Sequence, residues 1–370
     1  MGFWSTVPAM QSAKDRSVAP VPQQPAAPAR LPAGFEWCRI HIDDAAQLAE
    51  LSAFLNKNYV EASNGAATFR MQVTPAFLRW LLAAPGRLPG DDGHIAVRAN
   101  GKLMGFLAGT PAPALFQRRP MDLFVLNFLC VHRKLRGKRM LPVLVREAIR
   151  VAMRHDVPVG IYTSPVRPHE PVATCTYHQR VLDAGALTAS GFADEGTLRF
   201  MQVAPPTGTR VPGLRPMTEA DVPRVAELLR AHGEAQGATV RPAWRGDDDA
   251  RRLLPVPGVL HSFVVAAGAE GVPTDVISFY VVVLKTKAGE LRAAHQYYHA
   301  AGHTPLPHLV HDALVLAARA GCHLYNALDI GDTPRCFARL GFVPGSQLNY
   351  LMTNLSTPCM SPAKMGMILP

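Results

Sequence analysis

Apolar and polar positions alternate or recur with regular spacing along most of the chain from about residue 34 onward. Residues 34–42 alternate as a half-buried strand does. Residues 43–59 then place apolar side chains at helical spacing, and Asp43 or Asp44 is suited to cap that helix. The first ordered elements are therefore expected to be a strand and an amphipathic helix.

The next two segments carry cap and turn signals. Residues 73–82 predict a short helix, because Thr74 can accept a cap hydrogen bond and Pro75 suits the first helical position. Residues 94–112 predict two strands joined at Asn100-Gly101, a pair typical of tight hairpin turns. These two elements should extend the same folded body.

A continuous apolar run lies near the middle of the first half of the chain. Residues 122–131 favour a strand that is covered on both faces. Residues 141–154 then have helical spacing, with Pro142 near the start, and residues 157–164 read as a further strand. The pattern predicts strand, helix and strand in succession.

The helix at 141–154 has a second copy at 306–319, and a short strand follows each copy. The identical pairs are Leu141/Leu306, Pro142/Pro307, Leu144/Leu309, Val145/Val310, Ala148/Ala313, Ala152/Ala317 and Arg154/Arg319. A run of identities at one fixed offset indicates two weakly similar halves. We expect an N-terminal segment over 1–33, with a Pro- and Ala-rich linker from residue 9, a first half over 34–205 and a second half over 206–370.

Composition limits the classes of partner. The chain has 370 residues, a formal net charge of +10 and only 7% aromatic residues. It has none of the usual nucleic-acid motifs, so we expect no nucleic-acid partner and favour a phosphate-bearing small molecule. No apolar run is long enough for a membrane helix, and the six cysteines lack paired spacing. A cytoplasmic protein without a transmembrane segment is the resulting expectation.

Five cations crowd the loop between the apolar strand and the helix: Arg133, Lys134, Arg136, Lys138 and Arg139. A glycine loop that opens a helix offers free backbone amides and the positive end of the helix dipole, and Gly137 allows close approach of a ligand. The loop therefore favours a pyrophosphate, and a solvated basic turn is the alternative.

The repeat provides an internal comparison for this loop. Gly302 matches Gly137, but His303 and Thr304 replace Lys138 and Arg139. Only the first half is therefore expected to bind phosphate. The pattern Lys134-x-x-Gly137-x-Arg139 is a weak match to the loop of the acyl-CoA-dependent acetyltransferases, and by itself it favours a generic acetyltransferase.

Longer strings are more specific. "NFLCVHRKLRGKRMLPVLVREA", "VATCTYHQRVLDAGAL", "HDALVLAARAGCHLYNALD" and "CMSPAKMGMILP" closely resemble eukaryotic glycylpeptide N-myristoyltransferases, and "FWSTVP" and "GLRPMTEADVP" fall in the same order as in that family. The resemblance covers nearly the whole chain. It implies an α+β fold of two acetyltransferase-like (GNAT) halves, related by pseudo-twofold symmetry, in a saddle-shaped mixed β-sheet flanked by helices.

The resemblance also implies a reaction. Myristoyl-CoA would be a co-substrate that is not tightly bound as a cofactor, and its acyl group would pass to the N-terminal glycine of a protein or peptide. A monomer is expected. Residues expected at the acyl-CoA by matching family positions are Phe3, Trp4, Phe128, Leu129, Cys130, Val131, Arg136, Gly137, Lys138, Arg139, Met140 and Leu141.

Catalysis is expected to follow from groups that the resemblance assigns. The backbone amides of Phe128 and Leu129 would form an oxyanion hole, and the C-terminal carboxylate of Pro370 would act as base. Asn127 and Thr163 would orient that carboxylate or the attacking amine. The alternatives are a short-chain N-acetyltransferase of the same superfold and a catalytically impaired acyl-CoA-binding relative.

The peptide groove departs from the family pattern more than the acyl-CoA side does. Expected groove residues are Tyr59, Val60, Phe69, Tyr177, Tyr280 and His295. Glu61 is the only carboxylate in the loop that is usually acidic, and the run Tyr177-His178-Gln179 implies that the usual peptide-contacting histidine is missing or displaced. His295 stands where a tyrosine is usual, and Leu284 where a serine is. We therefore expect a weakened preference for basic residues in the substrate.

Two histidine arrangements suggest other chemistry. Cys175 with His178 could form a nucleophile pair, but a buried structural thiol is favoured. His308 and His311 have the spacing of a metal pair, but surface placement is favoured and no metal is expected.

Overall fold

A computed structural model describes residues 27–59, 61–63, 68–199, 201, 204, 206–267, 271–355 and 357–370 of the chain. The α-helices in these residues are α1 Ala45–Asn58, α2 Pro75–Leu82, α3 Met140–Arg154, α4 Ala184–Ala189, α5 Glu195–Leu198, α6 Val222–Gln236, α7 Asp247–Arg251, α8 Leu306–Arg319 and α9 Phe337–Leu340. Short 3-10 turns are η2 Pro89–Asp91, η3 Arg133–Leu135, η4 Glu219–Asp221, η5 Thr333–Cys336 and η6 Pro362–Lys364.

The strands in the described residues form one sheet. They are β1 Phe35–Arg39, β2 Glu61–Ser63, β3 Thr68–Gln72, β4 His94–Ala99, β5 Lys102–Phe116, β6 Arg119–Val131, β7 Val159–Ser164, β8 Ala173–Val181, β9 Leu214–Pro216, β10 Val240–Pro242, β11 Leu260–Ala267, β12 Val272–Lys285, β13 Glu290–Ala301, β14 Leu324–Leu328 and β15 Val343–Thr353. Their order along the main path is β1-β4-β5-β6-β7-β15-β8-β14-β13-β12-β11-β9.

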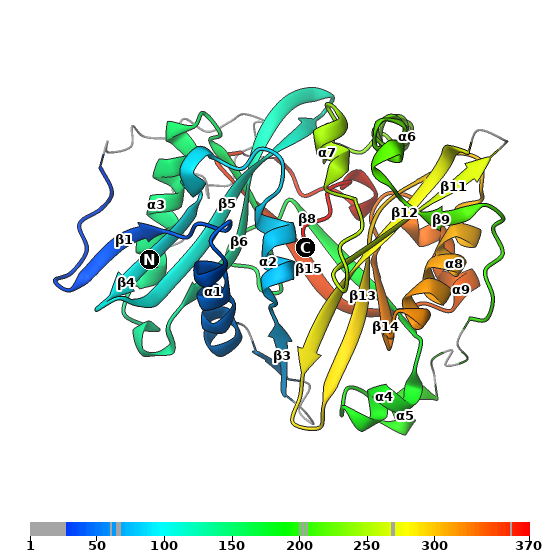
Figure 1. The fold of residues 1–370 in the computed structure, drawn as a ribbon, viewed down its shortest axis with the longest axis horizontal. Helices are drawn as coiled ribbons and strands as arrows, with labels where there is room; N and C mark the ends of the chain where they lie inside the picture. Colours follow the sequence, from blue (N-terminus) through cyan, green and yellow to red (C-terminus); the bar gives the residue numbers. More distant parts are fainter. Residues whose placement is uncertain are drawn as a thin grey trace.

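The sheet is mixed and open, and helices flank it (Figure 1). Strand β6 is parallel to β7, and β13 is parallel to β14, while the other strand pairs in the described residues are antiparallel. Each parallel pair is joined through one helix, α3 in the first case and α8 in the second. These two strand–helix–strand units contain the repeated sequence.

Alternation along the strands decides which helices cover each face. Phe106 and Ala108 of β5 pack in one core cluster with α1, α2 and α6. Leu107 between them packs in another cluster with α3. In the second half, Ile277 and Phe279 of β12 pack with α8. The helices α1, α2 and α6 therefore cover one face, and α3 and α8 cover the other.

Most elements predicted from the pattern are confirmed. Helix α1 begins after Asp44, whose side chain accepts hydrogen bonds from two amides of the first turn. Helix α2 begins at Pro75, with Thr74 as its cap. The Asn100-Gly101 pair joins β4 to β5, and both residues have positive φ, 49° and 72°.

The two halves interlock within the sheet. Strand β15 lies between β7 and β8, and β8 lies between β15 and β14. Strand β3 also pairs with β12. Figure 1 shows the C-terminal end of the chain at the centre of the molecule. In the part of the chain that the structure describes, no helix is both long and apolar enough to span a bilayer.

Candidate functional site

Strand β6 contains a β-bulge beside its carboxyl end. Cys130 pairs with Phe106, and Asn127 pairs with Ala108, so Phe128 and Leu129 together face Leu107. Phe128 has a positive φ of 55°. A bulge of this kind removes an amide from the strand ladder and leaves it available to another partner. The two residues expected to stabilise an oxyanion are therefore at an interruption in the pairing of β6 with β5.

The cationic loop lies between this bulge and α3. Gly137 and Arg139 both have left-handed backbone conformations, with φ of 75° and 61°. Arg139 occupies the N-cap position of α3, and its side chain makes no cap hydrogen bond to that helix. Because the first amides of a helix need external partners, this turn is suited to an anionic ligand.

A cavity of about 760 Å³ opens between the loop, the bulged strand and the end of α1. Its lining includes eight residues that were expected at the acyl-CoA: Leu129, Cys130, Val131, Arg136, Gly137, Arg139, Met140 and Leu141. Phe128 and Lys138, which were also expected there, do not line it. Phe3 and Trp4 lie outside the described residues. The structure thus brings most of the expected set to one cavity.

Four further residues line this cavity without having been expected at the acyl-CoA: Asn58, Tyr59, Leu135 and Pro142. Asn58 is buried at the end of α1, and its carbonyl oxygen accepts a 2.6 Å hydrogen bond from Arg136 Nη2. Its Oδ1 accepts from the amide of Arg133 at 3.2 Å. Asn58 therefore fixes the cationic loop against α1. Neither the residue type nor the sequence spacing of Asn58 predicts this role.

Burial controls the titration of the groups in this cavity. Burial raises the pKa of the Cys130 thiol to about 12, so it is protonated at neutral pH. Burial, together with Cys130, raises the pKa of Tyr59 to about 12 as well. Tyr59 had been expected in the peptide groove, but it lines this cavity and packs edge-on against Phe128 at 5.6 Å between ring centroids. The cavity wall is neutral, and its cations come from the loop.

The corresponding turn of the second half is occupied by the protein itself. Asp275 is fully buried, and its Oδ1 accepts hydrogen bonds from three consecutive backbone amides, at Gly302 (2.7 Å), His303 (2.8 Å) and Thr304 (3.0 Å). Its Oδ2 accepts from the hydroxyls of Thr274 and Thr304. A carboxylate of the chain thus satisfies the amides that a bound anion would otherwise contact.

The last residues of the chain run inward. Met365, Met367 and Leu369 are buried, and the hydroxyl of Tyr350 donates to the carbonyl oxygen of Met367 at 2.9 Å. The amide of Ile368 donates to the hydroxyl oxygen of Tyr298 at 3.2 Å. Two buried tyrosines therefore hold the final segment in place.

Pro370 and Asn127 line one small cavity of about 30 Å³. Asn127 directly precedes the bulge residue Phe128, so this cavity and the larger one adjoin the same stretch of β6. Thr163 does not line the small cavity; it lies in β7 opposite Tyr350 of β15. Asn127 therefore shares a cavity with the end of the chain, whereas Thr163 is the strand neighbour of Tyr350, whose hydroxyl donates to Met367.

Three of the expected groove residues form one aromatic cluster. The His295 ring stacks on Tyr280 at 5.2 Å between centroids and meets Tyr177 edge-on at 5.4 Å. Trp80 of α2 also packs against Tyr280, with 5.6 Å between the ring centroids. Burial lowers the pKa of His295 to about 4, so the ring is neutral at neutral pH. Asn326 Nδ2 lies 3.1 Å from its Nε2.

The other expected groove residues contact other aromatic rings or lie outside the described residues. Phe69 of β3 packs edge-on against Phe192 at 5.5 Å. Val60 lies outside the described residues. The structure therefore unites Tyr177, Tyr280 and His295, whereas Phe69 and Tyr59 have other aromatic partners.

The two histidine arrangements have different outcomes. Cys175 is fully buried, as expected, and burial raises the pKa of its thiol to about 12. His178 stacks on Phe337 instead. The expected surface placement of His311 is wrong, because this residue is only 5% exposed and its Nδ1 lies 3.0 Å from Asp312 Oδ1. Asp312 in turn accepts hydrogen bonds from the amides of Arg210 and Val211, which explains why this part of α8 is buried.

Comparison with known proteins covers both halves of the chain. Residues 14–175 match the N-terminal domain of the myristoyl-CoA:protein N-myristoyltransferases, and residues 195–367 match the C-terminal domain. Glycylpeptide N-tetradecanoyltransferase 2 of Danio rerio is 36% identical over 354 residues, which are 92% of this chain and 70% of that protein. A probable glycylpeptide N-tetradecanoyltransferase of Caenorhabditis elegans is 32% identical over 99% of this chain and 85% of its own length.

Solved structures agree with these relatives. The N-myristoyltransferase of Saccharomyces cerevisiae, crystallised with bound myristoyl-CoA, superimposes with a TM-score of 0.87 at 28% identity and covers 97% of this chain and 89% of its own. A GCN5-related N-acetyltransferase from Anabaena variabilis shares the fold at 12% identity, with a TM-score of 0.51. The chain belongs to the myristoyl-CoA:protein N-myristoyltransferase family.

Proposed function

We propose that this chain, an acyltransferase of the N-myristoyltransferase family, moves a myristoyl group from myristoyl-CoA to the N-terminal glycine amine of a protein or peptide by direct attack on the thioester. The amine nitrogen bonds to the thioester carbonyl carbon, the carbon–sulfur bond breaks, and CoA leaves as the thiol after taking up a proton. The amine transfers its proton to a base on the enzyme. Myristoyl-CoA is consumed as a co-substrate.

One observation carries the proposal. Five consecutive residues of β6, Asn127 to Val131, connect the small cavity at Pro370 to the large cavity at the cationic loop. The proposed base, the interruption in strand pairing and the cationic turn therefore all adjoin one stretch of β6. Acyl transfer needs these three features within reach of one carbonyl group.

The cationic turn supports binding of the CoA phosphates. Gly137 and Arg139 line the large cavity, and α3 begins beside it without a side-chain cap. Arginine provides charge-assisted hydrogen bonds that suit phosphate oxygens. The second half lacks these cations, and Asp275 already occupies its equivalent turn. One acyl-CoA per chain is the expected stoichiometry.

The bulge at Phe128 and Leu129 supports a role for their amides as the oxyanion hole. Attack by an amine places negative charge on the thioester oxygen, and fixed amides can stabilise that charge by several kcal/mol. Because Leu107 faces both residues, the strand ladder does not use every amide at this point. The positive φ of Phe128 changes the direction of the backbone there.

The carboxylate of Pro370 is proposed as the base. A free glycine amine has a pKa of roughly 7.7–8.0, so it is largely protonated at neutral pH and must lose a proton before attack. Pro370 lines its cavity with Asn127, and the buried Leu369 and the tyrosine contacts of the final segment hold it there. Asn127 and Thr163 are proposed as positioning residues, directly and through Tyr350 respectively.

The aromatic cluster of Tyr177, Tyr280 and His295 is proposed as part of the peptide groove. A neutral histidine between two phenol rings offers stacking and hydrogen bonds but no charge. A cytoplasmic location, a monomeric state and the absence of a nucleic-acid partner are further expectations for the chain.

The deciding experiment is mass spectrometry of a glycine-initiated peptide after incubation with the chain and myristoyl-CoA. A gain of the myristoyl mass on the terminal amine supports the proposal. Parallel reactions with lauroyl-CoA and acetyl-CoA test the short-chain alternative, which requires acetyl transfer to be fastest. Binding of myristoyl-CoA with no transfer to any glycine peptide would instead support the impaired relative.

A further inference from the structure

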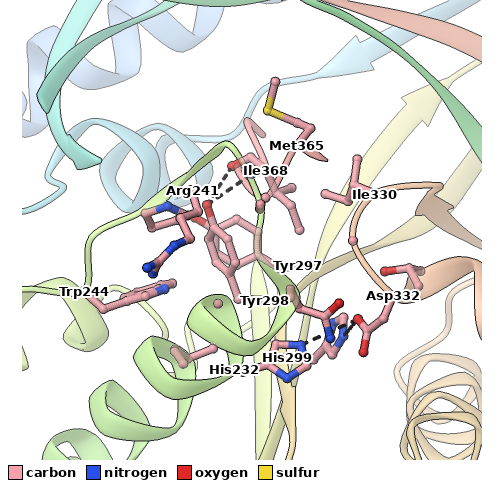
Figure 2. Close-up of a pocket in the computed structure, with 18 residues that line it drawn as sticks. His232, Arg241, Trp244, Tyr297, Tyr298, His299, Ile330, Asp332, Met365 and Ile368 are labelled. Atoms are coloured by element: carbon pink, nitrogen blue, oxygen red, sulfur yellow. Dashed lines mark hydrogen bonds and ion pairs between the residues drawn. The ribbon is translucent and has the colours of Figure 1, made fainter. Parts of the chain in front are cut away.

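Three side chains from separate parts of the second half meet beside a cavity that the proposed transfer reaction does not use. His232 lies on α6, His299 on β13 and Asp332 directly before η5 (Figure 2). One potential ligand atom from each lies within 4.8 Å of the other two. Asp332 Oδ1 is 3.0 Å from His299 Nε2 and 3.6 Å from His232 Nε2. The two rings meet at 5.1 Å between centroids.

These distances are close to those of a metal site. Zinc with nitrogen and carboxylate ligands at about 2.0–2.1 Å in tetrahedral geometry has neighbouring ligand atoms roughly 3.3 Å apart. The two distances to Asp332 lie on either side of that value. Two imidazoles and one carboxylate are also a donor set that first-row divalent metals prefer.

The surroundings favour a cation. Asp332 is 7% exposed, and its Oδ1 faces the Nε2 atoms of both His232 and His299. A carboxylate oxygen and two imidazole nitrogens therefore converge at one largely buried point. Figure 2 shows Arg241, the cation among the labelled residues, beside Trp244 and away from the three side chains.

Gln296 bears on the tautomer of His299. Its Nε2 lies 3.3 Å from His299 Nδ1, while its Oε1 is buried and has no hydrogen-bond partner among the described residues. Rotating the amide by half a turn lets Oε1 accept from Nδ1–H, and it moves Nε2 to the position where Oε1 had no partner. His299 then presents the lone pair of Nε2 toward Asp332 Oδ1, and only a proton or a metal ion between them makes that arrangement favourable.

There is room for the remaining ligands. The adjoining cavity has a volume of about 70 Å³ and reaches from Asp332 to Ile368. A water needs roughly 10–15 Å³ of such volume. Water can therefore complete the coordination of an ion held by three protein ligands.

We propose that His232, His299 and Asp332 bind one divalent transition-metal ion of the zinc class, with water from the cavity in the open position. The ion links α6 to β13 and to the start of η5, and it takes no part in acyl transfer. Binding releases or relocates the proton on His299 Nε2 and leaves the oxidation state of the metal unchanged.

Cobalt provides the direct test, because four-coordinate Co²⁺ absorbs strongly in the visible range. The full chain is stripped with a chelator and titrated with Co²⁺, and then with Zn²⁺ as competitor. The expected result is one saturable equivalent with the four-coordinate spectrum, displaced by Zn²⁺, and a Zn²⁺-dependent rise of roughly 2–4 °C in the unfolding midpoint. Failure to bind one equivalent with that spectrum overturns the proposal.

Variants locate the ion. His232→Gln and Asp332→Asn should each weaken cobalt binding at least about 10-fold, whereas His303→Gln, a change in an exposed loop outside the cluster, should leave it unchanged. The His232 side chain is more exposed than that of Asp332. The His232→Gln variant therefore decides the outcome if Asp332→Asn fails to fold. Stoichiometric binding that survives His232→Gln shows that cobalt binds elsewhere and overturns the assignment.

Discussion

Asp275 Oδ1 accepts a 2.7 Å hydrogen bond from the amide of Gly302, and in doing so it fills the turn that matches the cationic loop of the other half. The two turns have the same place after a long strand and before a repeated helix. One is lined with cations and opens on a cavity of about 760 Å³, and the other is closed by a buried carboxylate. The two turns therefore differ in charge, and only the cationic turn is proposed to bind a ligand.

Removing the Asp275 carboxylate should therefore cost stability without affecting acyl-CoA binding. Asp275→Ala leaves three amides without their acceptor, and we expect the free energy of unfolding to fall by about 3 kcal/mol. Thr274→Val, which removes one hydrogen bond to the same carboxylate, should cost only about 1 kcal/mol. Chemical denaturation measures both. Equal, small losses would contradict this account of the turn.

The same carboxylate should contribute to acid sensitivity. Burial raises its pKa, but the hydrogen bonds outweigh burial and lower the pKa below the usual value. The folded pKa is thus below the unfolded pKa of about 3.9, so this stabilisation is present above that pH and is lost as the pH falls through the folded pKa. Asp275→Ala should show a flatter loss of stability in that window than the unchanged chain.

Arg139→Ala should weaken use of myristoyl-CoA. The side chain lines the large cavity at the start of α3, and loss of a charge-assisted hydrogen bond to phosphate should raise the KM for myristoyl-CoA about 10-fold or more. His303→Ala is the matched control, because it changes the equivalent loop of the second half. Steady-state kinetics with both variants gives the comparison. An equal KM for myristoyl-CoA in the two variants would contradict the proposed contact between Arg139 and phosphate.

Extending the chain beyond Pro370 should separate binding from turnover. Two added glycines convert the terminal carboxylate into a peptide group at the cavity shared with Asn127. We expect transfer to fall by at least about 100-fold, while the affinity for acyl-CoA, measured by calorimetry, remains within about 2-fold because Gly137 and Arg139 are unchanged. Full activity in the extended chain would exclude this carboxylate as the base.

His295 should make stability depend on pH in the mildly acidic range. Burial lowers its pKa to about 4 from an unfolded value of about 6.5, so the unfolded state binds more protons between these values. Stability should consequently rise with pH from 4 to 6.5, by up to about 3 kcal/mol. His295→Gln should flatten that rise in urea denaturation, and His303→Gln should not. A wild-type curve that is flat across this window would contradict the assignment.

Peptide choice offers a separate test of the altered groove. Glu61 is the only carboxylate between Tyr59 and Arg70, and the neutral His295 adds no charge to the aromatic cluster. Glycine peptides with and without lysines a few positions downstream should therefore be acylated within about 3-fold of one another in kcat/KM. A strong requirement for lysine would show that other acidic groups supply the preference.

Local elements could be predicted because local chemistry specifies them. Thr74 and Pro75 predict the start of α2, and Asn100-Gly101 predicts a tight turn. The next hairpin, between β5 and β6, turns at Gln117 and Arg118, with φ of 50° and 69°. Neither residue is typical of positive φ, so tertiary pairing imposes the turn and the pattern does not reveal it.

The candidate site could be predicted only where charge or glycine marks it. The cationic loop can be predicted from its clustered charges. Asn58 cannot, because it acts partly through its backbone carbonyl oxygen, and every residue has one. The cluster of His232, His299 and Asp332 joins three segments that are distant in sequence, and no spacing connects them. Such sites depend on how distant segments of one half pack together, which periodicity does not specify.

The position of β15 has a consequence for how the protein is made. Both partners of β8, which are β14 and β15, are synthesised after it, so β8 leaves the ribosome as an unpaired strand. A polypeptide stopped near the middle would expose this strand and the free edge of β7, and open edges invite association between chains. Nascent copies should therefore need a chaperone until the last strand has emerged.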